Sequence, residues 1–445
     1  MVDVKPKDAV TSASVATEQR AAPSVKDIRG LIPPLGLTEY WYPALEDKKV
    51  KCKPIGLKML GEDLVFFRGK DGNVAALWNV CPHRGGSLMH GDCHFEGTVS
   101  CPYHGWTFDS DGNVLAVLPE GPESKIPGKV QARKYLTVTL KGMVFVWMGN
   151  EAPAPIEEDV PPEFFDSDSH ILFFDEIWPA QWNVALENGG DAHVPYVHRD
   201  AARNFMVAMR PISGPYGGRQ KMINGRAIVT GVLTGRTGGG SSSAGVTPVK
   251  QPTKKGSLWQ RTYFPQLDAY WPKHRRRLLW MWLFKPGGWT TPPTVYSNEN
   301  VPEEWQGGHH LPSMYRGNRG ESFFTRACVA ITEKTSRQIY YKAVKPRSWI
   351  GLVYEKIHWK LWAKWSQANF SSQDFVAVEP QRYDTQEMLS ATDIHQVLWR
   401  RLVLQARGMM TLDEAAGMEE TPAEEFSHDR QRELGQEPDL IVPTS

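Results

Sequence analysis

The sequence predicts an α+β protein in which an all-β domain at the N-terminus precedes a domain with an antiparallel sheet flanked by helices. Two observations predict this order. Three short hairpin patterns follow one another between residues 64 and 147, and helical periodicity appears later, from residue 349 onward. The chain has 445 residues, which is long enough for two or three domains.

The predicted hairpins share one pattern, in which two runs of mainly apolar residues flank a tight turn that contains glycine. The strand pairs are 64–67 with 74–77, 106–108 with 114–117, and 136–140 with 144–147. Hairpins that follow one another so closely indicate a small all-β domain.

Residues 151–163 (EAPAPIEEDVPPE) are rich in proline and acidic residues, and we expect them to form a linker over the surface. Beyond them the sequence mixes strand and helix periods, which predicts an α+β second domain. Its expected elements are strands at 171–177 and 277–284, helices at 349–365 and 385–407, and a flexible Gly/Ser-rich loop at 234–247. The first of these helices is predicted by apolar residues four apart: Val353, Ile357, Leu361 and Trp365.

Composition excludes several classes of protein. Hydrophobic residues make up 41% and charged residues 23%, which excludes global disorder. The 51 Lys and Arg residues nearly balance the 50 Asp and Glu residues, so the net charge of +1 argues against a nucleic-acid partner. No apolar run reaches the roughly 18 residues of a transmembrane helix, so we expect no membrane association.

The five cysteines are few and odd in number, which argues against a disulfide framework. Residues 1–30 lack the apolar run of a secretory signal. We therefore expect a cytoplasmic protein whose cysteines are free to bind metal.

Residues 81–106 read CPHRGGSLMHGDCHFEGTVSCPYHGW and contain two short Cys–His units. One residue separates Cys81 from His83, two residues separate Cys101 from His104, and seventeen lie between the units. Two Cys on one iron and two His on the other is the ligand set of a Rieske [2Fe–2S] centre. The alternative is a tetrahedral zinc, but zinc fingers usually pair Cys with Cys and His with His. The intervening Cys93, His90 and His94 match no ligand position, and we interpret them as ordinary loop residues.

A second candidate site lies in residues 182–200, WNVALENGGDAHVPYVHRD. His193 and His198 are five apart, which leaves roughly 140° between them on a straight helix, so a kink at the nearby glycines or Pro195 is needed to bring them together. Two His and a distant carboxylate form the facial triad of non-haem Fe(II) oxygenases. Alone, such a pair is a weak signal and is more typical of two unrelated surface or core histidines. After a Rieske motif, it indicates a mononuclear iron site.

With these two motifs, residues 38–410 resemble the α subunits of Rieske non-haem iron ring-hydroxylating oxygenases. The resemblance is greatest to the terminal oxygenases of the carbazole-dioxygenase type, which share LGLTEYWYPAL, PPEFFD and ENG-x-D before the histidines. It implies a flexible tail at 1–38, a Rieske domain at 39–152, a catalytic non-haem iron domain at 153–420 and a C-terminal tail at 421–445.

The resemblance also implies the third iron ligand. The family places its carboxylate beside the helix that closes the pocket, and Asp374 with Glu379 in FSSQDFVAVE fits its D-x-x-x-x-E pattern. The alternative for Asp374 is an N-cap of whatever follows. Asp384 and Asp393 are the other candidate ligands.

Asp191 is the expected catalytic residue by the same resemblance. The family's Asp accepts a hydrogen bond from an iron-ligand His and bridges it to a Rieske His of the neighbouring subunit. Here one residue, not two, separates Asp191 from His193, which departs from the family's pattern. If Asp191 is not the bridge, Glu187 and Asn188 are the next groups to test.

The resemblance implies the terminal oxygenase of a multicomponent system for aromatic compound catabolism. Electrons from NAD(P)H pass through a ferredoxin or reductase and the [2Fe–2S] cluster to a mononuclear Fe(II), which activates O₂ for di- or monooxygenation of an aromatic substrate. A homotrimer without a β subunit is expected. The alternative is an O- or N-demethylating monooxygenase acting on a non-hydrocarbon substrate. The rival classes are an electron carrier and a zinc-stabilised interaction protein.

We expect apolar and aromatic side chains from residues 205–380 to line the substrate pocket. The candidates are Phe205, Met206, Trp282, Phe284, Phe323, Phe324, Trp362 and Phe370. Each of them could instead be ordinary core packing.

Overall fold

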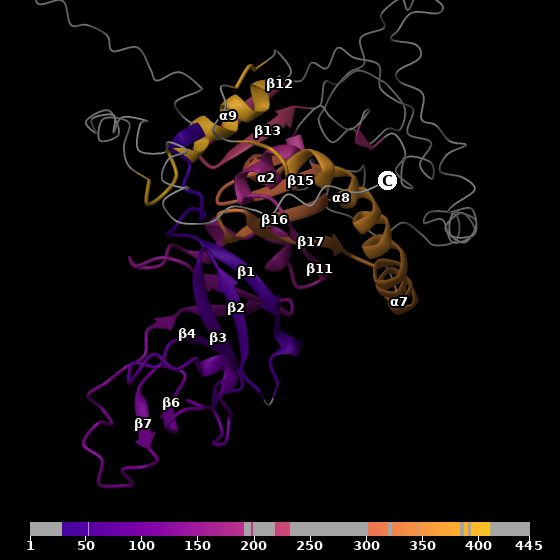
Figure 1. Cartoon of the computed structure of the whole chain (residues 1–445). Coiled ribbons are helices and arrows are strands. Elements are labelled where there is room, and N and C mark those ends of the chain that lie inside the picture. The colour runs from indigo at the N-terminus through magenta and orange to yellow at the C-terminus, as the bar shows by residue number, and fades with distance from the viewer. Residues whose placement is uncertain are drawn as a thin grey trace, which may run out of the picture.

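A computed structural model of the chain shows a β-rich N-terminal part joined to a larger sheet with helices (Figure 1). The structure describes residues 29–51, 53–190, 197–198, 219–231, 301–318, 323–346, 348–382, 387–389 and 393–409. The predicted strand at 277–284 and the predicted loop at 234–247 lie outside these residues.

The N-terminal part contains three small antiparallel sheets. The first has the order β1 (Trp41–Glu46), β10 (Met143–Trp147) and β9 (Thr137–Leu140). The second has the order β2 (Ile55–Met59), β3 (Glu62–Arg68), β4 (Val74–Trp78) and β8 (Lys134–Tyr135). The third has the order β5 (Val99–Ser100), β6 (Trp106–Phe108) and β7 (Val114–Val117). The three predicted hairpins are confirmed as the pairs β3–β4, β6–β7 and β9–β10.

The second part is built on one antiparallel sheet of seven described strands, in the order β11-β17-β16-β15-β14-β13-β12. The strands are β11 (His170–Trp178), β12 (Arg219–Ile223), β13 (Ala227–Gly231), β14 (Gly308–His310), β15 (Met314–Asn318), β16 (Phe323–Thr332) and β17 (Thr335–Val344). The strand predicted at 171–177 is confirmed as β11. The predicted α+β class, with helices beside an antiparallel sheet, is also confirmed.

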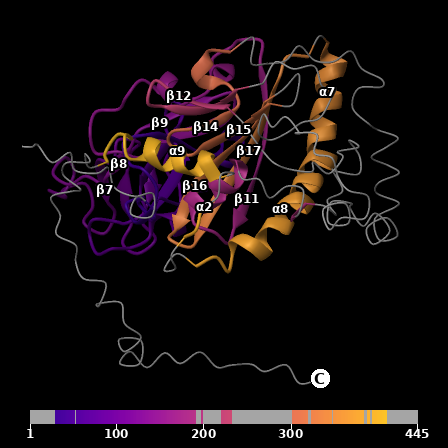
Figure 2. The same cartoon turned by 90° about the horizontal axis from the view of Figure 1, so that it is seen from above.

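The helices of this part are α2 (Trp182–Gly190), α7 (Trp349–His358), α8 (Lys364–Val378) and α9 (Ile394–Val403). A π-helical segment, η6 (Trp359–Ala363), joins α7 to α8, so that they form one long rod beside the sheet (Figure 2). The Ser348 hydroxyl accepts a hydrogen bond from the Gly351 N–H at 3.2 Å, which caps the start of α7. α2 packs against β14–β17 and against α9.

Two helix predictions need correction. The helix expected at 385–407 is shorter, because residues 387–389 are not helical and α9 begins at Ile394. The apolar stripe expected at 349–365 does form a helix, but Val353, Ile357 and Leu361 are exposed by 44%, 52% and 57%. The four-residue period therefore identified the helix, but not the face that packs on the sheet.

The expected surface linker at 151–163 is also corrected. This segment forms two short 3₁₀ turns, η3 (Ile156–Glu158) and η4 (Pro162–Phe164), and Asp159, Val160 and Glu163 are buried. Asp159 accepts a hydrogen bond from the Trp41 N–H at 3.0 Å and pairs with Arg407. Buried carboxylates of this kind need cationic or N–H partners. The acidic residues therefore hold the two parts together.

One hydrophobic cluster runs without interruption from the sheet of β1, β10 and β9 into the seven-stranded sheet. A second, smaller cluster packs under the loops that carry the Cys–His units and includes Cys81, Cys101 and Trp106. Among the described helices, none is long and apolar enough to cross a membrane.

Candidate metal centres

The two Cys–His units lie on two loops that close in the same way. In each loop the cysteine N–H donates to the carbonyl of the residue five positions later, Gly86 or Trp106, at 2.8 Å. The N–H of a glycine four positions after each cysteine donates back to the cysteine carbonyl, from Gly85 at 2.9 Å and from Gly105 at 3.0 Å. Both glycines have φ near +70°, a conformation that favours glycine. The backbone alone therefore presents the two units as matched turns.

The cysteine side of this pair of loops is buried. A Cβ added at Gly86 would lie 3.0 Å from the Cys101 Sγ and 3.9 Å from the Cys81 Cβ, so the glycine leaves the space that the two thiols share. Burial, and then the neighbouring Cys101, raise the pKa of the Cys81 thiol to about 11. Such a pair becomes thiolate when a metal cation binds, since metal binding releases the protons.

The histidine side faces outward. The rings of His83 and His104 lie 4.7 Å apart between centroids, and His83 also stacks on Trp106 at 4.7 Å and 3°. His83 and the neighbouring Tyr103 are exposed. The end of the site that carries the imidazoles is therefore the end that reaches solvent.

This sorting by residue type fits a binuclear cluster. Among the described residues, no group of three or more His, Cys, Asp or Glu side chains is placed to hold a single ion. A tetrahedral zinc would need all four side chains to converge on one point. A [2Fe–2S] cluster needs two pairs, one for each iron, and the loops present a cysteine pair and a histidine pair.

The second site joins two residues that are far apart in the sequence. The Nε2 atom of His198 lies 3.0 Å from the Oδ1 atom of Asp374, and both side chains are buried, with 0% and 2% exposed. Two atoms that bind side by side to one octahedral ion at about 2.1 Å lie about 3.0 Å apart. The observed distance therefore suits a shared metal ion. The other expected residues, His193 and Asp191, lie outside the described residues.

The groups around this pair allow a metal-binding form of the imidazole. The His198 Nδ1 atom lies 3.3 Å from the Gln373 Oε1 atom, an acceptor, so Nδ1 can carry the ring hydrogen when a metal binds. In that tautomer the Nε2 lone pair, on the side of Asp374, serves as the metal ligand. The Asn188 amide donates to the Asp374 Oδ1 atom at 3.2 Å, and Phe370 stacks on the His198 ring at 3.5 Å. A cation bound between Nε2 and Oδ1 would take one ligand atom from each residue, so the residues fit a bound metal.

The structure corrects the expected setting of Asp374. It lies inside α8, four residues before the helix ends, and therefore does not cap a later helix. Glu379 is the exposed residue directly after α8, and Asp393 precedes the first residue of α9. Asp384 lies outside the described residues.

Of the expected pocket residues, Phe370 lies at this site through its contact with His198. Phe324 packs against Tyr340 with 5.5 Å between ring centroids, on the strands β16 and β17. The remaining candidates before residue 300 lie outside the described residues: Phe205, Met206, Trp282 and Phe284.

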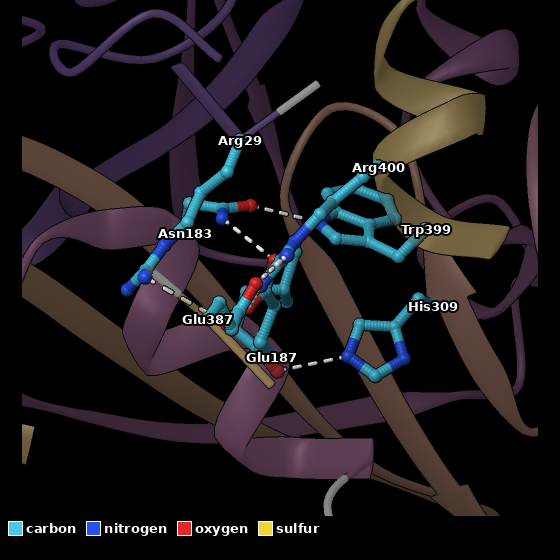
Figure 3. A network of polar contacts seen from close by, with 8 residues as sticks. Arg29, Asn183, Glu187, His309, Glu387, Trp399 and Arg400 are labelled. Atoms are coloured by element: carbon cyan, nitrogen blue, oxygen red, sulfur yellow. Dashed lines mark hydrogen bonds and ion pairs between the residues drawn. The ribbon is translucent and has the colours of Figure 1, made fainter. Parts of the chain in front are cut away.

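Sequence reasoning missed the side chains that hold α2. Arg400 on α9 forms an ion pair with Glu187 on α2 (Figure 3). His395 on α9 contacts His309 on β14. Glu187 stands in the recognisable ENGG motif. Nothing local to Arg400 marks it as the partner, because the two residues are 213 positions apart.

Comparisons with known proteins agree with this geometry. A family model described as the Rieske [2Fe-2S] domain matches residues 40–134, and one described as the homotrimeric ring hydroxylase matches residues 147–217. The chain is 34% identical over 222 residues to the terminal oxygenase component of carbazole 1,9a-dioxygenase from Metapseudomonas resinovorans. That match covers 48% of this chain and 57% of the relative, so the chain spans about half the length of the curated relatives it matches.

Solved structures show the same fold. The terminal oxygenase of carbazole 1,9a-dioxygenase from Nocardioides aromaticivorans has a TM-score of 0.64 at 24% identity, covering 86% of this chain and 98% of that chain. A reduced complex between oxygenase and ferredoxin in carbazole 1,9a-dioxygenase has a TM-score of 0.62 at 22% identity, covering 89% and 97%. The resemblance that the motifs predicted is confirmed: the chain matches the Rieske [2Fe-2S] domain and the homotrimeric ring hydroxylase, and it is similar to terminal oxygenases of carbazole 1,9a-dioxygenase.

Proposed function

We propose that this chain is the terminal oxygenase of a multicomponent Rieske oxygenase that hydroxylates an aromatic substrate by di- or monooxygenation. In this proposal Cys81, His83, Cys101 and His104 hold a [2Fe–2S] cluster. His193, His198 and Asp374 hold a mononuclear Fe(II). The domains would be 39–152 for the cluster and 153–420 for the iron, with a C-terminal tail at 421–445. The expected tail at 1–38 is too long, because Ile32 and Leu37 are buried in the main hydrophobic cluster.

The observation that carries the proposal is the contact between His198 and Asp374. An imidazole and a carboxylate from distant parts of the sequence meet at 3.0 Å in a buried site, in a domain that follows a Rieske domain. An electron carrier needs no second site of this kind. A zinc-stabilised interaction protein would not present the cysteines and histidines as separate pairs.

When bound, the cluster would supply single electrons, and an Fe(II) held by His193, His198 and Asp374 would supply O₂ activation. The chain's own residues do the rest. Gln373 and Asn188 fix the His198 ring and the Asp374 carboxylate in place, and Phe370 keeps water from one face of His198. Asp191 is assigned the bridging role toward a cluster histidine of a neighbouring subunit.

The electron donor in this proposal is a ferredoxin, itself reduced by an NAD(P)H-dependent reductase. Solved oxygenase–ferredoxin complexes of carbazole 1,9a-dioxygenase share the fold, and the histidine side of the cluster loops is the exposed side. We further propose a homotrimer, which the description of the second family model supports, and a cytoplasmic location, where thiols stay reduced.

Metal content and oxygen uptake test the proposal together. The purified protein should contain about three irons and two acid-labile sulfides per chain, since the cluster accounts for two of the irons. With NADH, a surrogate ferredoxin and its reductase, it should consume O₂ in the presence of carbazole-like and smaller aromatic compounds, and mass spectrometry should detect hydroxylated products. Two irons per chain and no substrate-dependent O₂ uptake would leave only an electron carrier.

A further inference from the structure

The short helix α2 carries Glu187 and Asn188 and leads directly into the segment of the expected iron ligands. From the opposite side, the Arg400 side chain of α9 reaches α2 while only 1% of its surface is exposed. Its Nε and Nη2 atoms donate to the two carboxylate oxygens of Glu187, each at 2.8 Å (Figure 3). Such a two-point contact fixes the orientation as well as the distance of the two side chains.

The charges around Arg400 are balanced. Glu387 also accepts hydrogen bonds from Arg400, and Arg29 lies 3.7 Å from Glu387, so two cations meet two carboxylates. Burial alone would lower the pKa of Arg400, but the hydrogen bonds with Glu187 and Glu387 raise it above its ordinary value. The group therefore stays charged, and removal of one partner would leave an uncompensated buried charge.

Two neighbouring residues connect this cluster to the iron site. Glu187 is held from α9, and the next residue, Asn188, donates its amide to the Asp374 Oδ1 atom on α8. Asn183, one turn earlier on α2, donates to Glu187 at 2.9 Å and accepts from the Trp399 indole at 2.7 Å. The rotation of α2 about its axis is thus set by α9, and that rotation decides where the Asn188 amide points.

The end of α2 is held from the same side. A Cβ added at Gly190 would lie 2.6 Å from a His309 ring atom and 2.7 Å from a His395 ring atom, so the backbone packs directly on the two rings. His309 is itself fixed by a hydrogen bond of 2.8 Å to the Leu186 carbonyl of α2. The last turn before Asp191 therefore has little freedom to rotate.

We propose that Arg400 is a positioning residue of the mononuclear iron site, acting through Glu187 on the orientation of α2 and so on the Asn188–Asp374 hydrogen bond. The inference rests on the proposed function, because it assigns a support to the iron site named there. Arg400 touches neither metal nor substrate. Its effect is on how well the ligands are arranged before the metal binds.

The chain offers a matched control. Arg316 on β15 forms another buried two-point ion pair, with Glu163 of η4, at 2.7 and 3.3 Å. This pair connects β15 to η4, in the segment between the two parts of the chain, and does not involve α2. Lysine in place of either arginine keeps the charge but loses the planar fork, so Arg400→Lys and Arg316→Lys should destabilise the fold similarly.

The experiment measures metal affinity, not turnover. A chelator removes the mononuclear iron from wild type and both variants, and Fe(II) is then titrated back under anaerobic conditions, with the Rieske absorption as internal reference. We expect Arg400→Lys to weaken Fe(II) binding by about tenfold or more, in line with other supports of metal ligands. Arg316→Lys should bind Fe(II) like wild type. The Rieske absorption should be unchanged in both.

Equal Fe(II) affinities in the two variants would overturn the inference, because loss of a buried ion pair would then act only through general stability. If Arg400→Lys yields no folded protein, Glu187→Gln takes its place, since it removes the negative charge but keeps the shape. The same loss of affinity is then expected, and wild-type affinity overturns the inference. A wild-type chain that takes up no third iron would instead overturn the proposed function, and this inference with it.

Discussion

The two candidate metal centres are supported in different ways. The cluster loops lie within residues 81–106 and are shaped by their own backbone hydrogen bonds, with the histidine side open to solvent. The site of His198 and Asp374 is buried, and side chains from α2, α8 and α9 hold it or the helix beside it. A centre that exchanges electrons with another protein needs exposure, whereas a centre that handles O₂ benefits from exclusion of water. Because local backbone hydrogen bonds shape the cluster loops, metal binding there should be less sensitive to substitutions in distant helices than metal binding at His198 and Asp374.

The largest expected effect is at the cluster. Cys81→Ser should abolish the visible absorption of the [2Fe–2S] centre, because a lost ligand destabilises the cluster. Absorption and circular dichroism spectra of the purified variant measure this. Cys93→Ser, in the loop between the two units, is the control and should keep the spectrum. A Cys81→Ser protein with the wild-type spectrum would show that the cluster is held elsewhere.

The next effect separates the two centres. Asp374→Ala should remove the mononuclear iron and turnover, whereas the Rieske spectrum and its reduction by a donor should survive, since the cluster ligands lie in another part of the fold. Iron-to-sulfide ratios and O₂ uptake measure the two properties. Glu379→Ala, just after α8, is the control. Near-normal activity of Asp374→Ala, with loss in Asp384→Ala, would identify a different carboxylate.

The link between the centres is tested by Asp191→Asn. The change keeps the shape but removes the negative charge that would hold an imidazole N–H. Both metal sites should remain filled, and electron transfer from cluster to iron should slow by at least about tenfold. Stopped-flow reoxidation of the reduced cluster with substrate and O₂ measures the step. An unchanged rate at full iron occupancy would exclude Asp191 as the bridge and direct attention to Glu187 and Asn188.

The smallest effect concerns acid stability of the seven-stranded sheet. Burial, and then Arg316, lower the pKa of His310 to about 3, whereas an unfolded histidine titrates near 6.5. Between these values the unfolded state binds the extra proton, so the free energy of unfolding falls as the pH falls. In the wild type, this titration should lower the free energy of unfolding by about 2 kcal/mol when the pH falls from 7 to 5.

His310→Gln should remove that contribution, because glutamine does not titrate but can still donate a hydrogen bond to the Gln306 carbonyl, as His310 does at 2.8 Å. Urea unfolding at the two pH values measures the difference between variant and wild type. An equal loss of stability in both proteins would mean that His310 is protonated in the folded state.

The sequence predicted the centres to different extents for a physical reason. The cluster ligands are close together in the chain, and Gly85 and Gly105 shape turns that depend only on neighbouring residues. Asp374 was found through a family pattern, since no local property separates it from other carboxylates. Arg400 and Glu187 meet only after the sheet has formed, so no spacing rule could pair them.

The same reasoning explains the wrong prediction of a surface linker. Proline and acidic residues usually mark exposed chain, but Glu163 and Asp159 are buried because Arg316 and Arg407 reach them from distant segments. Composition describes a segment without its partners. The prediction from composition was therefore wrong for a segment that is buried through ion pairs with distant residues.

The π-helical segment Trp359–Ala363 allows the long rod of α7 and α8 to lose one residue without a rotation of α8. A π turn holds more residues than an α turn, so it can store one extra residue without changing which side of α8 faces the sheet. Loss of one residue within this segment could be absorbed by a return to α-helix, with Asp374 still directed at His198. Residues 366–372 are in α-helix and cannot absorb such a deletion. Loss of one residue there would turn Asp374 by about 100° away from His198.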